Sequence, residues 1–294
     1  MLAAALVSAA LVGLVRAQDI PAVASPTDLA LVSAQYENSG FSQGGNAGFG
    51  IELDAKAVLT VVYPFGAVEN GASYTVDQVS EGPDLYVTPA ESTVGWFNSS
   101  SRYTVALADA SSLGDPDAEG NYRHFLANSL DGAAAEGDNL TFTPSNGQVI
   151  TYYAAPGPIE GTGPHRYAWL LFEQPADFSA PSNLSTSGVN PSHWYVNSYV
   201  EETGLQLLAA SFFTVSNGDA TGSVAETQAV NTATLSAAPS ATSGGSSTSA
   251  GSASETTSSG SPSASAAPDN GAAQLVLSVG AGALGVVGLA AAML

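Results

Sequence analysis

Short runs of hydrophobic residues recur through the middle of the chain, and glycine, proline, asparagine or aspartate bounds most of them. The runs are about four to eight residues long and rich in valine, tyrosine, phenylalanine and leucine, as β-strands usually are. The pattern predicts strands over residues 58–63, 85–88, 103–109, 124–130, 148–153, 167–173 and 209–215. We therefore expect a mostly β domain over residues 27–216, built from one sheet packed on another.

A single helix is predicted between Asn190 and Gly204. Asn190 can cap its start, Pro191 suits its first turn, and Gly204 can end it. The positions that recur at helical spacing between them are Val196, Tyr199, Val200 and Thr203. His193 falls in the first turn of this helix, where we expect a solvated surface residue.

The first part of the chain has the pattern of a targeting signal. An apolar run extends from Met1 to Val15, and Val15-Arg16-Ala17 places compact residues where a signal peptidase cuts. We expect a signal peptide over residues 1–17, followed by a short lead over residues 18–26. A buried N-terminal helix is the alternative.

The last part of the chain has the pattern of a membrane-anchoring signal. Residues 275–294 carry no charge, and about 20 apolar residues are enough to cross a bilayer as a helix. No basic residue follows this segment, and the small residues Asn270-Gly271-Ala272 precede it. We expect attachment of a GPI anchor at Asn270 and removal of residues 271–294. A retained transmembrane tail is the alternative.

Residues 217–270 consist largely of Ser, Thr, Ala, Gly and Pro. Such a segment cannot offset its ordering entropy by burial, so we expect a disordered, O-glycosylated stalk. Acceptor motifs for N-glycosylation occur at Asn98, Asn139 and Asn183, which predicts three surface loops. Together these features predict a secreted glycoprotein held at the outer face of the plasma membrane or in the cell wall.

The charge balance excludes nucleic acids as partners. The chain has 26 acidic and 5 basic residues and a formal net charge of -21, whereas nucleic-acid binding needs clustered Lys and Arg. The absence of cysteine excludes disulfides and thiol catalysis. We expect no cofactor.

Residues Gly40-Phe41-Ser42-Gln43-Gly44 match the G-x-S-x-G motif of serine esterases. That motif works because a buried strand leads into it and a helix leaves it. Glu37-Asn38-Ser39 precedes it here and Gly45-Asn46-Ala47-Gly48 follows, so neither flank fits. We interpret the segment as a glycine-rich loop.

A second set of motifs lies between residues 115 and 167. It consists of Asp115-Pro116-Asp117-Ala118, then Tyr122-Arg123-His124-Phe125-Leu126, then Gly161-Thr162-Gly163-Pro164-His165-Arg166-Tyr167. In this order and spacing the motifs resemble those of the phosphatidylethanolamine-binding protein family. The resemblance extends through residues 59–63, 68–71, 204–205 and 209–213, and so covers the whole middle domain.

The resemblance implies a β-sandwich with a large antiparallel sheet, a second smaller sheet and peripheral helices, one of them near the C-terminal end of the domain. It also implies one shallow anion pocket. The residues that match the pocket residues of the family are Asp115, Asp117, His124, Tyr153, Gly157, Pro158, His165, Arg166 and Tyr167. Arg166 is as much a structural partner of the carboxylates in that family as a ligand contact.

Each of these residues also has a purely structural interpretation. Imidazoles donate to phosphate oxygens and a carboxylate can orient an imidazole, but His124 in a strand can equally be a core histidine. Asp115 and Asp117 can serve to hold the turn around Pro116. A metal site built from Asp115, His124 and His165 is conceivable, but nothing in their spacing requires it.

Two departures from the family pattern change the expected rim of the pocket. Glu119 replaces a proline of the usual motif, and Pro158-Ile159 replaces the usual Pro-Pro. Glu119 and Glu160 place negative charge near the expected mouth. We therefore expect anion binding to strengthen as the pH falls through the range in which histidines gain a proton.

The sequence thus predicts a non-catalytic cell-surface module that binds a small anion or a phospholipid headgroup. One alternative is an inhibitor of a serine carboxypeptidase or another hydrolase, with a protease as partner. A second is a structural glycoprotein with a vestigial pocket. A third is a hydrolase that uses Asp115, Asp117 and the two histidines as acid and base.

Overall fold

The structure is a computed structural model, and it describes residues 20–44, 48–98, 100–115, 119–134, 140–142 and 147–222, with Ala225, Val230 and Leu235. The chain divides into two units, residues 1–243 and 244–294, and the described residues belong to the first. The expected signal peptide, the anchor site at Asn270 and the tail over residues 271–294 lie outside the described residues, as do Asp117 and Asn139.

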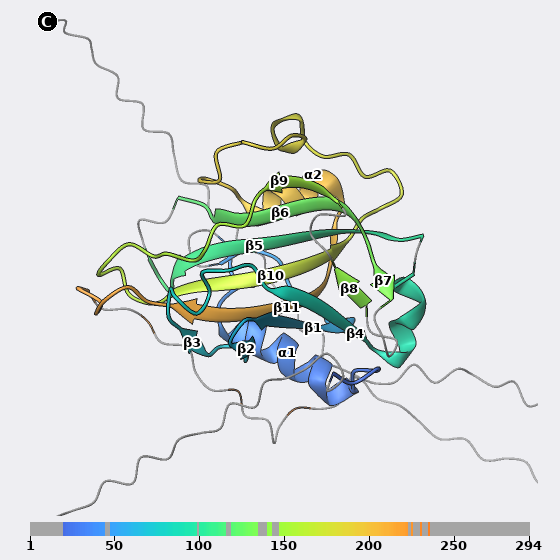
Figure 1. Cartoon of the computed structure of the whole chain (residues 1–294), viewed down its shortest axis with the longest axis horizontal. Helices are drawn as coiled ribbons and strands as arrows, with labels where there is room; N and C mark the ends of the chain where they lie inside the picture. Colours follow the sequence, from blue (N-terminus) through green and yellow to red (C-terminus); the bar gives the residue numbers. More distant parts are fainter. Residues whose placement is uncertain are drawn as a thin grey trace, which may run out of the picture. The chain divides into compact units, whose positions relative to one another are not determined.

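Two sheets make up the described fold (Figure 1). The six-stranded sheet has the order β3 (Ser73–Tyr74), β11 (Gln206–Val215), β10 (His165–Glu173), β5 (Arg102–Ser112), β6 (Tyr122–Asp131) and β9 (Gln148–Thr151). The five-stranded sheet has the order β2 (Gly66–Ala67), β1 (Ala57–Tyr63), β4 (Asp84–Pro89), β8 (Leu140–Phe142) and β7 (Ala133–Ala134). Apart from the parallel pair β3 and β11, the described strands pair antiparallel.

The mostly β class and the larger and smaller sheets are confirmed. All seven predicted strands form, as β1, β4, β5, β6, β9, β10 and β11. The prediction for β9 was too long, because the strand ends at Thr151 and leaves Tyr152 and Tyr153 outside the ladder. The two- and three-residue strands were not predicted, since so few residues show no alternation.

An unpredicted helix, α1 (Pro26–Asn38), precedes the first strand. The Ser25 hydroxyl accepts a hydrogen bond from the Asp28 backbone N–H at 3.2 Å, and the Asp28 carboxylate accepts one from the Ser25 N–H at 3.1 Å. This reciprocal cap, with Pro26 at the first position, is a start signal that the sequence Ser-Pro-Thr-Asp carries. Two short 3₁₀-helices cover Glu91–Trp96 and Ser182–Leu184.

The second helix, α2 (Val196–Thr203), starts later than predicted. The segment from Asn190 to Trp194 is bound elsewhere: the Pro191 carbonyl accepts from the Arg123 N–H, and Trp194 exchanges backbone hydrogen bonds with Asn121. Those groups are therefore not available to a helix, and His193 lies before α2 rather than in its first turn. The predicted end is confirmed, because Gly204 follows the helix with φ 68°.

The core occupies both faces of the six-stranded sheet. Along β10, Tyr167, Trp169 and Leu171 face the cluster between the two sheets. The alternate residues of β10 face a second cluster, to which α1 and α2 contribute Val32, Tyr36, Val196 and Tyr199. This is why β10 is apolar at successive positions, since a strand that is covered on both faces does not alternate with polar residues.

The residues at the limits of the domain are also bound into the fold. Ala24 forms a β-bridge with Ala90, and the backbone N–H and the hydroxyl of Thr221 both donate to the Gly161 carbonyl. Asn98 and Asn183 are exposed, as expected of glycosylation acceptors. Within the described ranges, no helix has both the length and the apolar character that crossing a membrane requires.

Candidate functional site

Three strands bring polar residues together at one end of the six-stranded sheet. In the ladders, Asp109 on β5 lies opposite both Tyr167 on β10 and Tyr122 on β6. His165, at the start of β10, lies opposite Ser112 at the end of β5. The end of β5 and the starts of β6 and β10 therefore lie at the same end of the six-stranded sheet (Figure 1).

The Asp109 carboxylate lies between two imidazoles. Its Oδ2 is 3.0 Å from His165 Nδ1 and 3.9 Å from His124 Nε2. The three side chains are largely buried, with exposed fractions of 10% for Asp109, 12% for His165 and 8% for His124. We call Asp109, His124 and His165 the strand-end site.

Backbone and hydroxyl groups fix the orientation of both rings. His124 Nδ1 is 2.8 Å from the Ala154 carbonyl, which can only accept, so this nitrogen carries the proton and Nε2 faces Asp109. His165 donates from Nδ1 to Asp109, and its Nε2 is 2.9 Å from the Thr162 hydroxyl. That hydroxyl is also 2.7 Å from the Ile159 carbonyl. When Thr162 donates to Ile159, its oxygen can accept a hydrogen bond from Nε2 of His165.

The charge of Asp109 is stabilised by its neighbours. Burial alone would raise the pKa of this carboxyl, but hydrogen bonds and charge from His124 and His165 outweigh burial and lower the pKa to about 2. Asp109 therefore remains ionised across the physiological range. The site is a buried anion flanked by two groups that can each carry a positive charge.

Asp115 reaches this site through Ser111. The Ser111 hydroxyl donates to the Asp115 carboxylate at 2.6 Å, and the Ser111 N–H donates to Asp109 Oδ1 at 2.6 Å. Ser111 has φ 58°, a left-handed conformation that the surrounding contacts hold. Asp115 thus fixes the loop after β5.

Arg166 is a structural residue in this fold. Its guanidinium donates to the carbonyls of Ala110 at 2.7 Å, Ser111 at 3.2 Å and Ser39 at 2.8 Å. Burial lowers its pKa to about 10, although the Asp109 charge acts in the opposite direction. Arg166 links the end of β5 to the residue that follows α1.

The two predicted tyrosines face the interior. Tyr167 packs edge-on against the His124 ring at 5.2 Å, and its buried hydroxyl has no hydrogen-bond partner among the described residues. Burial, and then the nearby Asp109 charge, raise the pKa of Tyr167. Tyr153 stacks on Trp169 and donates to the Val79 carbonyl at 2.5 Å, so its hydroxyl points between the sheets.

The loop from Gly157 to Thr162 borders the site beside His165. Gly157 is exposed and Pro158 is buried, with the Pro158 carbonyl accepting from Asn217 at 3.1 Å. In the loop between β5 and β6, Glu119 Oε2 lies 3.5 Å from His193 Nδ1, and both side chains are exposed. His193 is therefore solvated, as predicted, and it lies beside the loop between β5 and β6.

Sequence reasoning missed Asp109, the residue on which the site is centred. In the sequence it marks only the end of a predicted strand, whereas the Asp-Pro-Asp-Ala motif six residues later matches the pocket motif of the family. The available signal was a carboxylate within the apolar run of β5, where a charge is costly to bury unless it is paired.

The sequence pattern of the family described as phosphatidylethanolamine-binding protein matches residues 60–213, which is just over half of the chain. The chain belongs to the phosphatidylethanolamine-binding protein family. The match contains all of β5, β6 and β10, and therefore the whole strand-end site.

Two proteins of Saccharomyces cerevisiae are among those similar in sequence to this chain. The carboxypeptidase Y inhibitor of Saccharomyces cerevisiae is 32% identical over 77 residues, or 24% of this chain and 35% of that protein. An uncharacterized protein of the same yeast is 26% identical over 115 residues, or 35% of this chain and 57% of that protein. The matches thus span about a third of the length of the inhibitor and just over half of the length of the uncharacterized protein.

A solved structure of the carboxypeptidase Y inhibitor complexed with its cognate proteinase shares the fold. The TM-score is 0.50 at 21% identity, over 62% of this chain and 93% of that chain. At this identity the likeness concerns the fold alone.

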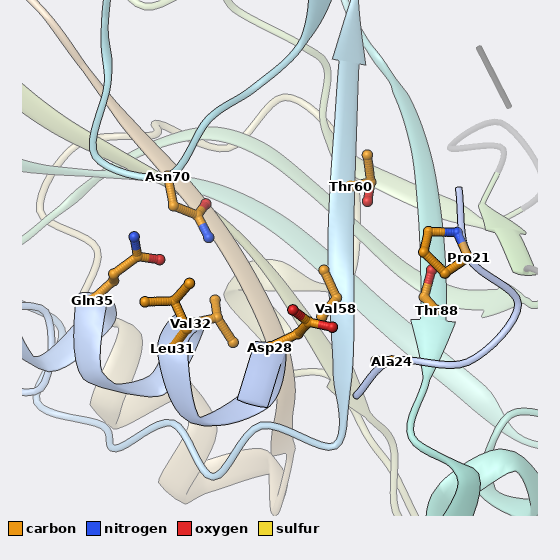
Figure 2. A pocket seen from close by; sticks show the side chains of 10 residues that line it. All are labelled: Pro21, Ala24, Asp28, Leu31, Val32, Gln35, Val58, Thr60, Asn70 and Thr88. Carbon is orange, nitrogen blue, oxygen red and sulfur yellow. The ribbon is translucent and has the colours of Figure 1, made fainter. Parts of the chain in front are cut away.

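A separate cleft of about 300 Å³ lies between α1 and the outer face of β1 and β4 (Figure 2). Leu31, Val32 and Val58 supply apolar walls, and Asp28, Gln35 and Asn70 are polar residues that line it. We call this the helix–strand cleft. It contains none of the residues that the sequence predicted for the pocket. Among the residues that the structure describes, no cluster of three or more His, Cys, Asp or Glu side chains could hold a metal ion.

Proposed function

We propose that the strand-end site binds the phosphate group of a small anion or of a phospholipid headgroup, without catalysis. The observation that supports this most directly is the convergence of His124 and His165 on the ionised Asp109. When both rings carry a second proton, the two imidazolium groups and the Asp109 carboxylate give the site a net charge of about +1. A phosphate at the site would then meet two imidazoles whose orientation is already fixed by Ala154, Asp109 and Thr162.

Among the described residues of the proposed site, the buried carboxylate is not arranged for acid catalysis. Asp109 is held ionised and is occupied by two imidazoles, so it is a poor general acid. Asp115 accepts from Ser111 in the loop. The hydrolase alternative is therefore less well supported than binding.

Calorimetry with O-phosphoethanolamine and with inorganic phosphate tests this function. At pH 6 we expect saturable binding by the full chain, and a loss of at least about tenfold in His165→Ala, because charge-assisted hydrogen bonds to the anion disappear. His193→Ala is the matched control, since His193 is exposed and pairs only with Glu119. Equal binding by all three proteins, or no binding by any, rejects the proposal.

We also propose that binding strengthens at lower pH. Glu119 and Glu160 are exposed beside the site and repel an anion, whereas protonated histidines attract it. Affinity for inorganic phosphate that is flat, or that rises with pH, between about pH 4 and 8 contradicts this part of the proposal.

Inhibition of a serine carboxypeptidase is the second candidate function. Its support is the 32% identity to the yeast carboxypeptidase Y inhibitor and the shared fold with that inhibitor in its proteinase complex. Titrating the chain against carboxypeptidase Y activity tests it. Inhibition that persists in His165→Ala would assign the activity to a surface outside the strand-end site, and undiminished protease activity at a molar excess of the chain rejects it.

We propose that the domain acts outside the cell on a GPI-anchored stalk, glycosylated at Asn98, Asn139 and Asn183. The exposure of Asn98 and Asn183 supports the glycosylation. Release of the chain from cells by phosphatidylinositol-specific phospholipase C is the expected result. Retention on the cells after that treatment would favour a transmembrane tail or the structural-glycoprotein alternative in a wall.

A further inference from the structure

Two large apolar side chains are exposed near the end of the 3₁₀-helix that covers Glu91–Trp96. The exposed fractions are 48% for Val94 and 37% for Trp96. We call these two residues the tryptophan patch. Isolated exposed apolar residues are ordinary in soluble proteins, so their surroundings decide what they mean. The patch is followed directly by Asn98, the first of the three N-glycosylation acceptors.

Contacts with buried residues support Trp96. Its carbonyl accepts a hydrogen bond from the Tyr103 hydroxyl at 2.8 Å. The neighbouring Phe97 is buried and stacks on the Tyr103 ring, with the ring centroids 6.0 Å apart. The Lys56 ammonium lies 5.8 Å from the centroid of the Trp96 ring, which is close enough for a cation–π contact. The indole is therefore held by its neighbours, although more than a third of the residue is exposed.

The Asn98 side chain turns its amide nitrogen towards the same helix end. Nδ2 donates to the Gly95 carbonyl at 2.7 Å, and Oδ1 accepts from the Ser100 N–H at 2.8 Å. The Gly95 carbonyl belongs to the peptide bond that joins Gly95 to Trp96. The nitrogen that carries an N-linked glycan thus lies one hydrogen bond away from the Trp96 backbone. After attachment of a sugar this nitrogen keeps one hydrogen, so it can still donate to Gly95.

The tryptophan patch distinguishes Asn98 from the other two acceptors. The residue two positions before the asparagine is Trp96 in the first acceptor motif, whereas it is a glycine at Asn139 and a proline at Asn183. An aromatic platform therefore precedes only the first of the three acceptors at this spacing.

We propose that the N-linked glycan of Asn98 packs on the tryptophan patch. The C–H groups on one face of a pyranose ring carry a slight positive charge and are attracted to the negative face of an indole. The sugar is uncharged, so the formal net charge of -21 on the chain does not oppose the contact. This inference rests on the proposed glycosylation of Asn98 and adds a structural role for that glycan, which covers an exposed apolar surface of the domain.

Tryptophan fluorescence isolates this contact. The chain has three tryptophans, and Trp169 and Trp194 are only 1% and 6% exposed, so quenching by acrylamide reports mainly on Trp96. The full chain is secreted from a eukaryotic host, and mass spectrometry measures the occupancy of Asn98. We expect Asn98→Gln to raise the quenching constant about twofold, because the sugar no longer shields the indole. Asn183→Gln is the matched control and should leave the constant unchanged.

Two further samples separate the sugar from the turn that carries it. Wild type and Asn98→Gln made in a bacterial host carry no glycan, and we expect acrylamide to quench them equally. A difference between them as large as that between the secreted proteins would assign the effect to the Asn98 hydrogen bonds and overturn the proposal. Trp96→Phe should abolish the dependence on the glycan, and a dependence that persists in this variant also overturns the proposal.

The occupancy of Asn98 distinguishes failure of this inference from failure of the glycosylation on which it rests. A glycan at Asn98 without any effect on quenching overturns the inference and leaves the proposed glycosylation standing. An equal rise in Asn183→Gln does the same. If Asn98 carries no glycan in the secreted chain, both the inference and the proposed glycosylation of Asn98 fail.

Discussion

The strand-end site and the helix–strand cleft show that shape and chemistry can occupy different parts of one domain. The cleft has the volume, about 300 Å³, but the Asp28 carboxylate that lines it already caps α1. The strand-end site has ionisable groups that converge within 3.0 and 3.9 Å. Because recognition of an anion requires oriented donors rather than volume alone, the proposed anion binding concerns the strand-end site and not the cleft.

Arg166 provides the largest expected effect, because it links the end of β5, which carries the strand-end site, to α1, the helix that lines the cleft. Arg166→Met leaves the carbonyls of Ser39, Ala110 and Ser111 without their donor. We expect a loss of about 3 kcal/mol or more in the free energy of unfolding, measured in urea. A loss below about 1 kcal/mol would show that the two regions are not coupled through this residue.

Asp109→Asn tests the strand-end site alone. The substitution keeps the shape but removes the charge that holds two imidazoles, and we expect a loss of about 2 kcal/mol in unfolding free energy at pH 7. Binding of inorganic phosphate should weaken about tenfold as the rings lose their common acceptor. Asp28→Asn should leave phosphate binding unchanged, and equal effects of the two substitutions would remove the distinction between the regions.

The pH dependence of stability tests whether Asp109 in the strand-end site is ionised. The Asp109 pKa is about 2 in the folded protein and 3.8 in its ordinary state. A lowered folded pKa stabilises the fold above the ordinary value, and this contribution is lost as the pH falls through the folded value. The stability difference between wild type and Asp109→Asn should therefore be largest above about pH 4 and shrink towards pH 2. Urea unfolding at both pH values measures it, and a constant difference would contradict the ionised state of Asp109.

Ser25→Ala provides the smallest expected effect. It removes the hydroxyl that accepts from the Asp28 N–H at the start of α1, which typically costs about 1 kcal/mol. Thermal unfolding measures this loss. Phosphate affinity should not change, since the cap belongs to the wall of the cleft, and a change in affinity would mean that α1 also shapes the strand-end site.

The sequence was sufficient for the long strands but not for the pieces that depend on distant partners. The runs at β5, β10 and β11 are apolar and bounded by turn residues, so local pattern predicts them. The start of α2 was misplaced because Pro191 and Trp194 pair with the strand segment at Asn121 and Arg123, a contact that no local signal encodes. The cap at Ser25 was a local signal and was overlooked.

The strand-end site likewise contains residues that local motifs predict and one residue that depends on distant strand pairing. His124, His165 and Tyr167 were named from their motifs, and the structure brings them together. Asp109 was not predicted as a site residue, because the register between β5 and β10 decides which carboxylate faces the histidines. Register depends on the pairing of strands that are more than fifty residues apart, and the Asp-Pro-Asp-Ala motif offered a nearer alternative.

Nitrogen NMR of the three histidine rings during titration with inorganic phosphate tests the central proposal most directly. The chain contains three histidines, and His193 is an internal control because it lies on the surface beside Glu119. We predict that the ring signals of His124 and His165 shift together and saturate, whereas those of His193 stay constant. Unchanged signals from His124 and His165, or a shift confined to His193, would contradict phosphate recognition at the strand-end site.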